Sequence, residues 1–290
     1  ENILHLAEDF EGVDALEEPM PVKPGQHYEM GGLEVNEHGE TCIEGLYAAG
    51  ECACVSVHGA NRLGGNALPE LIVFGKRAGQ HAAGRDLGDP EITVGRSDDY
   101  EPGSVDTDVE LGSVDGEETA AADGGERADP EAVVEATVEA ERERVERLLE
   151  REDGVHHAHV RSQLQETMTE NVNVFRTEDQ LRRALADIRE AREEYEGVYV
   201  EDPSRTFNTD VVHTLETRNL LDLAEALTLG ALVRDEFRGA HWREGYQFRD
   251  DENWLKHTLV SWNGGDPELG FKPVVLEGES KTYEPKERSY

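Results

Sequence analysis

The sequence has no apolar run that approaches the roughly 18 to 20 residues needed to span a bilayer. It also lacks a basic segment followed by an apolar stretch, so it shows no secretory signal. These two absences predict a protein without direct membrane insertion. The sequence begins at Glu1 rather than at a methionine, and we expect it to be a fragment or a processed product of a longer protein.

Basic residues are also scarce. The chain has 28 lysines and arginines against 65 aspartates and glutamates, a net charge of −37. Nucleic-acid binding requires cations that meet phosphates, so this charge excludes it as a main function, and it argues against adsorption to anionic lipid. Because the acids are mostly interleaved with periodic apolar residues, we interpret them as the surface of a folded halophilic protein, whose self-repulsion a salt-rich cytoplasm screens.

Cysteine is rare as well. The three cysteines Cys42, Cys52 and Cys54 cannot all pair with one another. Cys52 and Cys54 lie too close in the sequence for an ordinary disulfide or for the usual zinc spacing. The sequence therefore predicts buried free thiols in a reducing compartment, and no metal site.

Residues 1–96 are rich in glycine and in residues that favour strands. Short strands are expected at 33–35 and 45–50, and the second is apolar throughout, as a buried strand of an α/β sheet would be. A helix is expected over 68–83. Its apolar positions, which can face a sheet, are Leu71, Ile72, Phe74, Gly75 and Ala78. Residues 97–128 are dense in Asp, Glu, Gly and Ser, and they predict an acidic linker or surface excursion.

Helical periodicity dominates residues 129–235 and predicts an antiparallel helical bundle. Asp129 and Pro130 are a good start for the first helix, with a capping aspartate and a proline in the first turn. Thr177 and Gln180 form the pattern of a capping box ahead of a later helix. The expected helices cover 129–151, 161–171, 177–195 and 220–231.

Residues 236–290 turn to aromatic residues, prolines and short strands, of which 273–276 is the clearest. We expect a small α+β segment here. The predicted fold class is therefore α/β plus α, with the α/β part in residues 1–96 and the helices after residue 128.

The segment 50–68 has the chemistry of a ligand site. An apolar stretch delivers the carboxylate of Glu51 at its end, where open α/β sheets bind ligands. Gly64, Gly65 and Asn66 let the backbone approach a ligand and begin a helix, whose N-terminus presents free amide hydrogens. Each element alone has an ordinary explanation, because glycine pairs are common in turns and a glutamate after a strand is usually solvated.

Together these residues resemble the second FAD-binding segment of the succinate dehydrogenase and fumarate reductase flavoprotein family. The resemblance rests on Gly50-Glu51 and on the run 56–66, Ser-Val-His-Gly-Ala-Asn-Arg-Leu-Gly-Gly-Asn. The segment 24–32, Pro-Gly-Gln-His-Tyr-Glu-Met-Gly-Gly, resembles a second family element, in which the histidine returns from the substrate-capping domain to the active site.

The segments 237–243 and 249–259 resemble the C-terminal domain of the same family. Their Arg-Gly-Ala-His and Arg-Asp-Asp-x-Asn-Trp elements favour this branch over its relatives, L-aspartate oxidase and adenylylsulfate reductase. An L-aspartate oxidase-like flavoenzyme remains an alternative. A non-catalytic remnant that acts as a helical interaction module is the other.

The resemblance implies an organisation and an activity. Residues 1–96 would be the C-terminal portion of an FAD-binding α/β domain with the end of the substrate-capping region, followed by the acidic linker (97–128), the helical bundle (129–235) and a C-terminal extension (236–290). The activity would be hydride transfer between succinate or fumarate and FAD. Electrons would pass to an iron–sulfur subunit, and membrane-anchor subunits would hold the assembly on the inner, cytoplasmic face of the cell membrane.

The resemblance also assigns roles to residues. Arg62 suits a substrate carboxylate as a permanently charged planar fork, with His27 as a second donor. Glu51 would accept hydrogen bonds from the flavin ribityl hydroxyls. The helix start would direct backbone amides at the flavin pyrimidine edge through Asn66, Ala67 and Leu68. The alternative for Arg62 is an ion pair with a structural acid.

Some parts of the family's site are expected elsewhere. The proton-transferring arginine and the flavin-linking histidine would lie upstream of Glu1, so we predict no catalytic residue in this chain. The sequence has no Gly-x-Gly-x-x-Gly fingerprint. Because that element usually holds the cofactor phosphates at a helix N-terminus, we expect the chain alone to bind FAD poorly.

Overall fold

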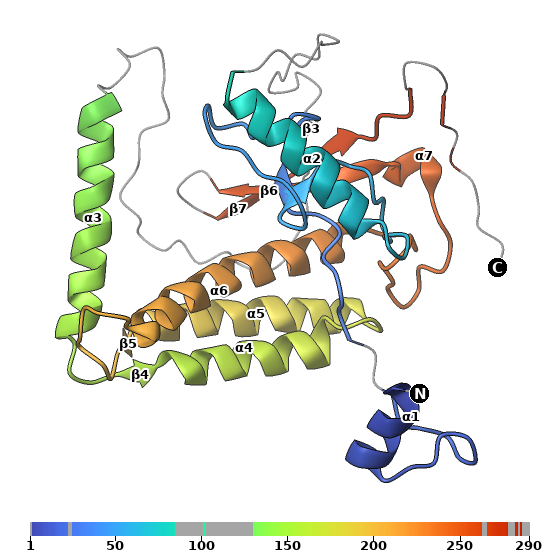
Figure 1. Cartoon of the computed structure of the whole chain (residues 1–290), viewed down its shortest axis with the longest axis horizontal. Coiled ribbons are helices and arrows are strands. Elements are labelled where there is room, and N and C mark those ends of the chain that lie inside the picture. Colours follow the sequence, from blue (N-terminus) through green and yellow to red (C-terminus); the bar gives the residue numbers. More distant parts are fainter. Residues whose placement is uncertain are drawn as a thin grey trace.

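The computed structural model describes residues 2–22, 25–84, 101–102, 130–262, 266–277, 282–283 and 285. The predicted acidic linker over 97–128 lies outside these residues, apart from the short strand β3 (Glu101–Pro102). Three long helices lie side by side, and a second group of elements around α2 and a small sheet lies above them (Figure 1).

The three-helix bundle confirms the helical part of the prediction. It consists of α4 (His157–Asn171), α5 (Glu178–Tyr195) and α6 (Thr209–Val233). The capping box forms as expected: the Thr177 hydroxyl accepts from the Gln180 amide at 3.2 Å, and the Gln180 side chain accepts from the Thr177 amide at 2.9 Å. Local chemistry of this kind predicts a helix start well.

Helix α6 begins well before the predicted residue 220, with Asn208 as its cap. The earlier turns were missed because threonines occupy the core-facing positions. Thr214 and Thr217 are fully buried, and each hydroxyl donates at 2.8 Å to the carbonyl four residues earlier. A hydroxyl that is satisfied inside its own helix can occupy a core position that periodicity analysis reserves for apolar side chains.

Two apolar clusters fill the bundle. The first joins Val160, Leu164, Ile188, Ala191, Tyr195, Val198, Leu221 and Ala224. The second joins Val172, Leu181, Ala184, Leu185, Leu229, Ala231, Leu232 and Leu269. Leu269 belongs to a strand near the C-terminus, so this second cluster fixes the bundle to the sheet above it.

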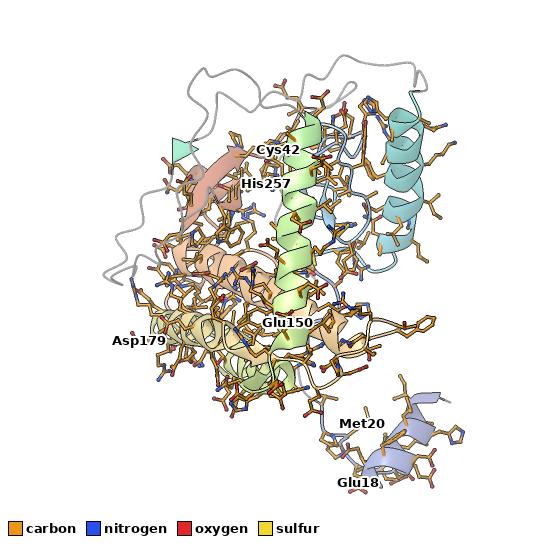
Figure 2. All side chains as sticks on the ribbon, turned by 90° about the vertical axis from the view of Figure 1, so that its left-hand side faces the viewer. Glu18, Met20, Cys42, Glu150, Asp179 and His257 are labelled. Carbon is orange, nitrogen blue, oxygen red and sulfur yellow. The ribbon has the colours of Figure 1, made fainter. Side chains whose placement is uncertain are left out.

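Helix α3 (Pro130–Glu150) matches the predicted helix over 129–151 and stands away from the bundle. In the turned view of Figure 2, Glu150 marks the end at which the chain enters the bundle. There β4 (Val155–His156) and β5 (Val198–Tyr199) pair in parallel. Arg205 donates to Glu146 at 2.6 Å and ties α3 to the loop before α6.

The N-terminal part contains few regular elements. They are α1 (Asn2–Leu6), a π-helix (Ala7–Glu11), β1 (Leu33–Glu34), β2 (Ala53–Cys54) and α2 (Ala67–Ala82). The predicted strand at 33–35 and the helix at 68–83 are present. Figures 1 and 2 show α1, with Glu18 and Met20 nearby, apart from the other elements.

The predicted strand at 45–50 is wrong. Within the described part of the chain, Tyr47 forms a single bridge with Glu40, and β1 pairs instead with β2. A strand forms only where a neighbouring strand supplies partners for its backbone hydrogen bonds. The composition of a segment does not show whether such a neighbour is present. The apolar face of α2 also differs from expectation: Ala78 is buried, but Leu71 and Ile72 are 43% and 70% exposed.

The cysteines are free, as predicted, but they are not all buried. Cys42 and Cys52 are exposed, which corrects the expectation of buried thiols, and Cys54 is half-buried. Burial raises the pKa of the Cys54 thiol.

The C-terminal part is built on a hairpin. It contains α7 (Asp251–Trp254), β6 (Lys256–Trp262) and β7 (Pro267–Pro273), with β6 and β3 on the two edges of β7. The predicted strand at 273–276 is wrong, because β7 ends at Pro273 and Val275 is 79% exposed. The hairpin was missed because polar residues and a glycine interrupt its alternation. Among the described residues, no helix combines the length and the apolar character that a membrane crossing needs.

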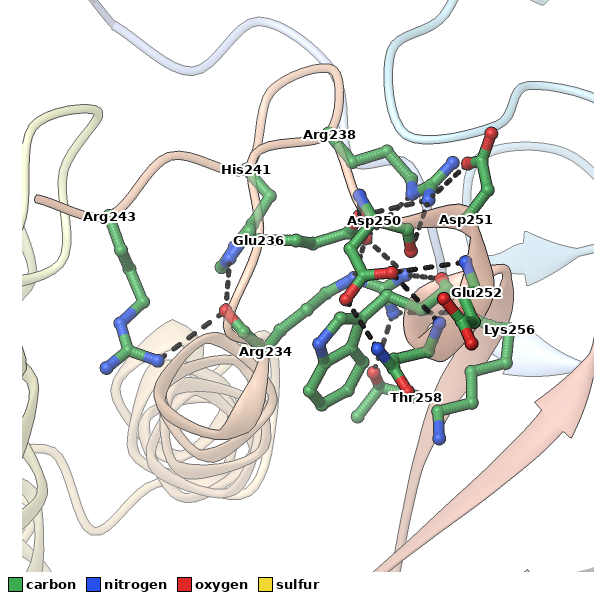
Figure 3. A network of polar contacts seen from close by, with 12 residues as sticks. Arg234, Glu236, Arg238, His241, Arg243, Asp250, Asp251, Glu252, Lys256 and Thr258 are labelled. Carbon is green, nitrogen blue, oxygen red and sulfur yellow. Dashed lines mark hydrogen bonds and ion pairs between the residues drawn. The ribbon is translucent and has the colours of Figure 1, made fainter. Parts of the chain in front are cut away.

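A buried ion network holds the loop after α6 (Figure 3). Glu236 has no exposed surface and accepts hydrogen bonds from Arg234 at 2.9 Å, Arg238 at 2.7 Å and the Asp250 amide at 3.0 Å. Arg243, which is 1% exposed, donates to Asp235 at 2.7 Å. Buried charges of this kind persist only when they are paired and hydrogen-bonded, so this loop has one defined conformation.

His241 lies inside this network as a neutral connector. Its Nδ1 accepts from the Arg176 guanidinium at 2.8 Å, and its Nε2 donates to the Arg234 carbonyl at 2.8 Å. Burial and the positive charge of Arg176 lower the pKa of His241 from 6.5 to about 4. The imidazole is therefore uncharged in the folded protein at neutral pH.

The same loop docks on the segment 50–68. The Ala240 amide donates to the Ala60 carbonyl at 2.8 Å. Gly239 has a φ of +59°, and a Cβ at this position would lie 2.4 Å from the Ala60 oxygen. Glycine is required here because the two backbones touch.

We predict that Gly239→Ala lowers the free energy of unfolding by about 2 kcal/mol, through backbone strain together with the clash against Ala60. Gly245→Ala is the matched control, since Gly245 has a φ of +93° and open space where the methyl group would go. Urea denaturation measures both variants. Equal losses in the two would show that contact with Ala60 contributes nothing.

We predict that His241 makes the fold sensitive to acid. Its folded pKa lies below the unfolded value, so the unfolded chain gains a proton first, and stability falls as pH drops from 6.5 towards about 4. The loss from this one residue reaches about 3 kcal/mol. His241→Asn keeps an acceptor for Arg176 but cannot titrate. Urea denaturation across this pH range is expected to give a shallower pH dependence for the variant, and parallel curves would contradict the prediction.

Candidate functional site

The segment 50–68 is fixed at three places. Gly50 has a φ of +84°, and a Cβ there would lie 2.4 Å from the side chain of Leu71 in α2. Ser56 has a φ of +67°, and its hydroxyl lies 2.9 Å from Nε2 of His257 in β6. The third place is the backbone contact at Ala60. Segments distant in the sequence therefore set the shape of this loop.

The segment that carries His27 lies directly against Glu51. The Glu29 amide donates to the Glu51 carboxylate at 2.9 Å. Gly32 has a φ of +106°, and a Cβ there would lie 2.4 Å from the Cys52 carbonyl oxygen, so the two backbones touch. The structure thus places the segment that carries His27 against Glu51, and the side chains of His27 and Glu51 are both exposed.

Arg62 lies in the same place, over the ring of Tyr28. The guanidinium carbon is 4.3 Å from the ring centroid, and one terminal nitrogen donates to the Leu63 carbonyl at 3.2 Å. The Nε atom is buried and has no hydrogen-bond partner among the described residues. Within the described residues Arg62 forms no ion pair with an aspartate or glutamate. A guanidinium held against an aromatic face, with donors to spare, is suited to an anion.

Tyr28 is positioned by groups that the sequence analysis did not single out. Its hydroxyl lies 3.2 Å from Nε2 of His58, and the same nitrogen lies 4.0 Å from the carboxylate of Glu70. Asn66 contacts the other ring nitrogen of His58 at 3.4 Å. Burial raises the pKa of Tyr28, and so do the charges of Glu70 and Glu51, whereas Arg62 lowers it. Tyr28 therefore remains a neutral phenol.

These residues had weak signals in the sequence. Tyr28 follows the predicted His27, and His58 lies inside the recognised run 56–66. Glu70 lies in the first turn of α2, where an acidic residue is usually explained by the helix dipole. Its burial, with 4% exposure and neither oxygen hydrogen-bonded, becomes evident only in three dimensions.

The start of α2 has the form of an anion-facing helix terminus. Asn66 makes no side-chain cap, so the amides of Ala67 and Leu68 are left without one. Before them, Gly65 has a φ of +82°, and apart from its chain neighbours no described residue has an atom within 4 Å of where a Cβ would be. This open glycine turn lets a planar ligand approach the two amides.

The geometry fits one side of a flavin site. An exposed carboxylate, an open glycine turn and two uncapped amides lie on one loop and the helix that follows it, and Arg62 lies between them. A flavin needs groups that accept hydrogen bonds from the hydroxyls of its ribityl chain. It also needs groups that donate hydrogen bonds to its pyrimidine edge. Glu51 and the start of α2 offer those two functions.

Comparison with known proteins supports this assignment. Residues 161–290 match the sequence model for the C-terminal region of the fumarate reductase flavoprotein. Residues 1–68 match the model for an FAD binding domain, which includes the loop and the helix start described above. The prediction of FAD as the cofactor is therefore confirmed at the level of the family.

The fumarate reductase flavoprotein subunit of Haemophilus influenzae is 37% identical over 275 residues, which are 94% of this chain and 40% of that protein. The succinate dehydrogenase flavoprotein subunit of Rickettsia conorii is 36% identical and covers 94% of this chain and 41% of its own length. A solved quinol fumarate reductase from E. coli matches with a TM-score of 0.73 at 34% identity, over 97% of this chain and 43% of that one.

This chain therefore spans about 40% of the length of the curated relatives it matches. The sequence match and the structural match extend over nearly the whole of it. The chain belongs to the succinate dehydrogenase and fumarate reductase flavoprotein family.

Proposed function

We propose that this chain forms the substrate-facing side of a flavoprotein subunit that interconverts succinate and fumarate. The observation that supports this most is Arg62, a partly buried guanidinium that lies over Tyr28 and pairs with no carboxylate among the residues that the structure describes. A dicarboxylate substrate needs a cation or donor at each end. When bound, FAD supplies the chemistry of accepting or donating a hydride.

Each residue of the site has a proposed role. Arg62 binds one substrate carboxylate with its planar fork, and His27 donates to a carboxylate oxygen. One oxygen of Glu51 is occupied by the Glu29 amide, which orients the carboxylate and leaves the other for the ribityl hydroxyls. The flavin pyrimidine edge would face the start of α2, at Asn66, Ala67 and Leu68.

The proposed setting follows from the relatives. Solved relatives include a quinol-fumarate reductase and the Sdh1 complex of Mycobacterium smegmatis. We propose that electrons pass to an iron–sulfur subunit in electron transport linked to the tricarboxylic acid cycle. Membrane-anchor subunits would then hold the flavoprotein peripherally on the inner, cytoplasmic face of the cell membrane. The acid-rich composition supports a halophilic protein.

In the full-length protein, we predict that Arg62→Lys lowers turnover of succinate about a hundredfold while flavin stays bound. Lysine keeps the charge but loses the two-pronged geometry and the stacking on Tyr28, so the substrate is misaligned. Steady-state kinetics with an artificial electron acceptor measure turnover, and the visible flavin spectrum measures cofactor content.

Arg142→Lys is the control for this experiment, because the Arg142 side chain is 62% exposed and pairs with Glu139 on the surface of α3. Turnover in that variant should match the parent. Near-normal turnover in Arg62→Lys would refute the proposed role of Arg62 in substrate binding. Loss of flavin from Arg62→Lys would instead assign Arg62 to cofactor support.

The acid-rich surface generates a second prediction. With a net charge of −37, folding concentrates negative charge that salt screens, so Tm should rise by several degrees between dilute buffer and about 1 M KCl. Thermal denaturation followed by circular dichroism measures this. A parallel series in sucrose reports stabilisation that does not depend on charge. A Tm that KCl leaves unchanged would exclude the halophilic interpretation.

A further inference from the structure

Two histidines and an aspartate converge at the end of the bundle where β4 and β5 pair (Figure 1). His156 and His157 lie at the start of α4, and Asp210 lies in the first turn of α6. The Nε2 atoms of His156 and His157 are 3.3 Å and 3.0 Å from the same oxygen of Asp210. All three donor atoms lie within 4.8 Å of one another.

These separations suit a metal ion. Bonds of about 2.0 to 2.1 Å and tetrahedral angles place the donor atoms of a zinc site roughly 3.3 Å apart. Two imidazoles and one carboxylate form a donor set for Zn²⁺ and similar divalent ions that leaves a coordination position for water. We propose that His156, His157 and Asp210 bind one divalent transition-metal ion of the zinc class. The spacing of the cysteines predicted no metal site, and a site built from His156, His157 and Asp210 contains no cysteine.

The surroundings favour a defined site over a chance cluster. The side chains of His157, Asp210 and His156 are 9%, 16% and 31% exposed, so one edge of the cluster reaches water. The second oxygen of Asp210 accepts from the amides of Glu201 at 2.6 Å and Asp202 at 3.3 Å, which fixes the carboxylate.

The competing arrangement is a metal-free one, in which both histidines donate a hydrogen to Asp210. The metal-free and metal-bound arrangements differ in one hydrogen bond. Nδ1 of His156 caps α4 by accepting from the Ala158 amide at 3.2 Å, so the hydrogen of a neutral His156 lies on Nε2. A metal on Nε2 moves this hydrogen to Nδ1, and the Ala158 amide then loses its acceptor. Metal binding therefore changes a backbone hydrogen bond that the metal-free arrangement preserves.

The ion would connect the start of α4 to the start of α6 at the end of the bundle, so it would act as a structural clip. A ligand that binds only the folded state stabilises it in proportion to its affinity and concentration. The inference does not depend on the succinate and fumarate assignment, because none of these three residues belongs to the proposed flavin or substrate site.

The test uses the 290-residue chain without an affinity tag. We expect Co²⁺ to bind with one equivalent and to produce visible d–d absorption, Zn²⁺ to displace it, and Zn²⁺ to raise Tm. His156→Asn should weaken Co²⁺ binding at least tenfold and remove the Tm shift. Asparagine remains a good helix cap, so α4 is preserved, and circular dichroism verifies the fold.

His159→Asn is the matched control, because the neighbouring His159 imidazole is 60% exposed and faces Glu194 at 3.7 Å. This variant should bind Co²⁺ like the parent. Two-dimensional NMR should show the Ala158 amide shifting on addition of Zn²⁺. Absence of stoichiometric binding, equal binding by His156→Asn, or an unchanged Ala158 amide would each overturn the proposal in favour of the metal-free arrangement.

Discussion

The candidate site depends on an arginine that forms no ion pair with an acid in the part of the chain that the structure describes. In a chain with 65 acidic residues, partners for a cation are abundant, yet within the described part of the chain Arg62 contacts the Tyr28 ring and the Leu63 carbonyl instead of a carboxylate. A cation–π contact contributes about 0.5 to 2 kcal/mol, depending on desolvation, and leaves the hydrogen-bond donors of the guanidinium free. The fold must hold Arg62 away from the surrounding acids, and this requirement explains much of the neighbouring structure.

The first support for the position of Arg62 is the set of contacts that fixes Tyr28. The Tyr28 hydroxyl meets His58, which in turn lies between Asn66 and the buried Glu70. A buried carboxylate without hydrogen bonds is unfavourable unless a cation or donor lies close by, and Nε2 of His58 lies 4.0 Å from the Glu70 carboxylate. This series of contacts links the orientation of the Tyr28 ring, and with it Arg62, to the first turn of α2. The substrate side and the flavin side of the proposed site are therefore one connected structure.

The second support for the position of Arg62 is the C-terminal loop. This region also shows which features can be predicted from the sequence and which cannot. The helix starts at the Thr177 capping box and at Pro130 were predictable, because they depend on residues that are close together in the sequence. The pairing of β1 with β2 was not, nor was the docking of Gly239 on Ala60, because composition does not specify which distant segment supplies a partner. The recognised runs directed attention to His27, Glu51 and Arg62, whereas the burial of Glu70 is evident only in the structure.

Neutral histidines connect the elements around the site without adding buried charge. The junction already buries the charges of Glu236 and Arg243, and each further buried charge would need a partner of its own. A neutral imidazole offers one donor and one acceptor without charge. His241 joins Arg176 to the Arg234 carbonyl, and His257, whose pKa is lowered by burial and by Lys272, meets Ser56. These connectors lie where the bundle, the hairpin and the site loop meet. Uncharged imidazoles thus act beside the buried ion network to fix the loop on which Arg62 depends.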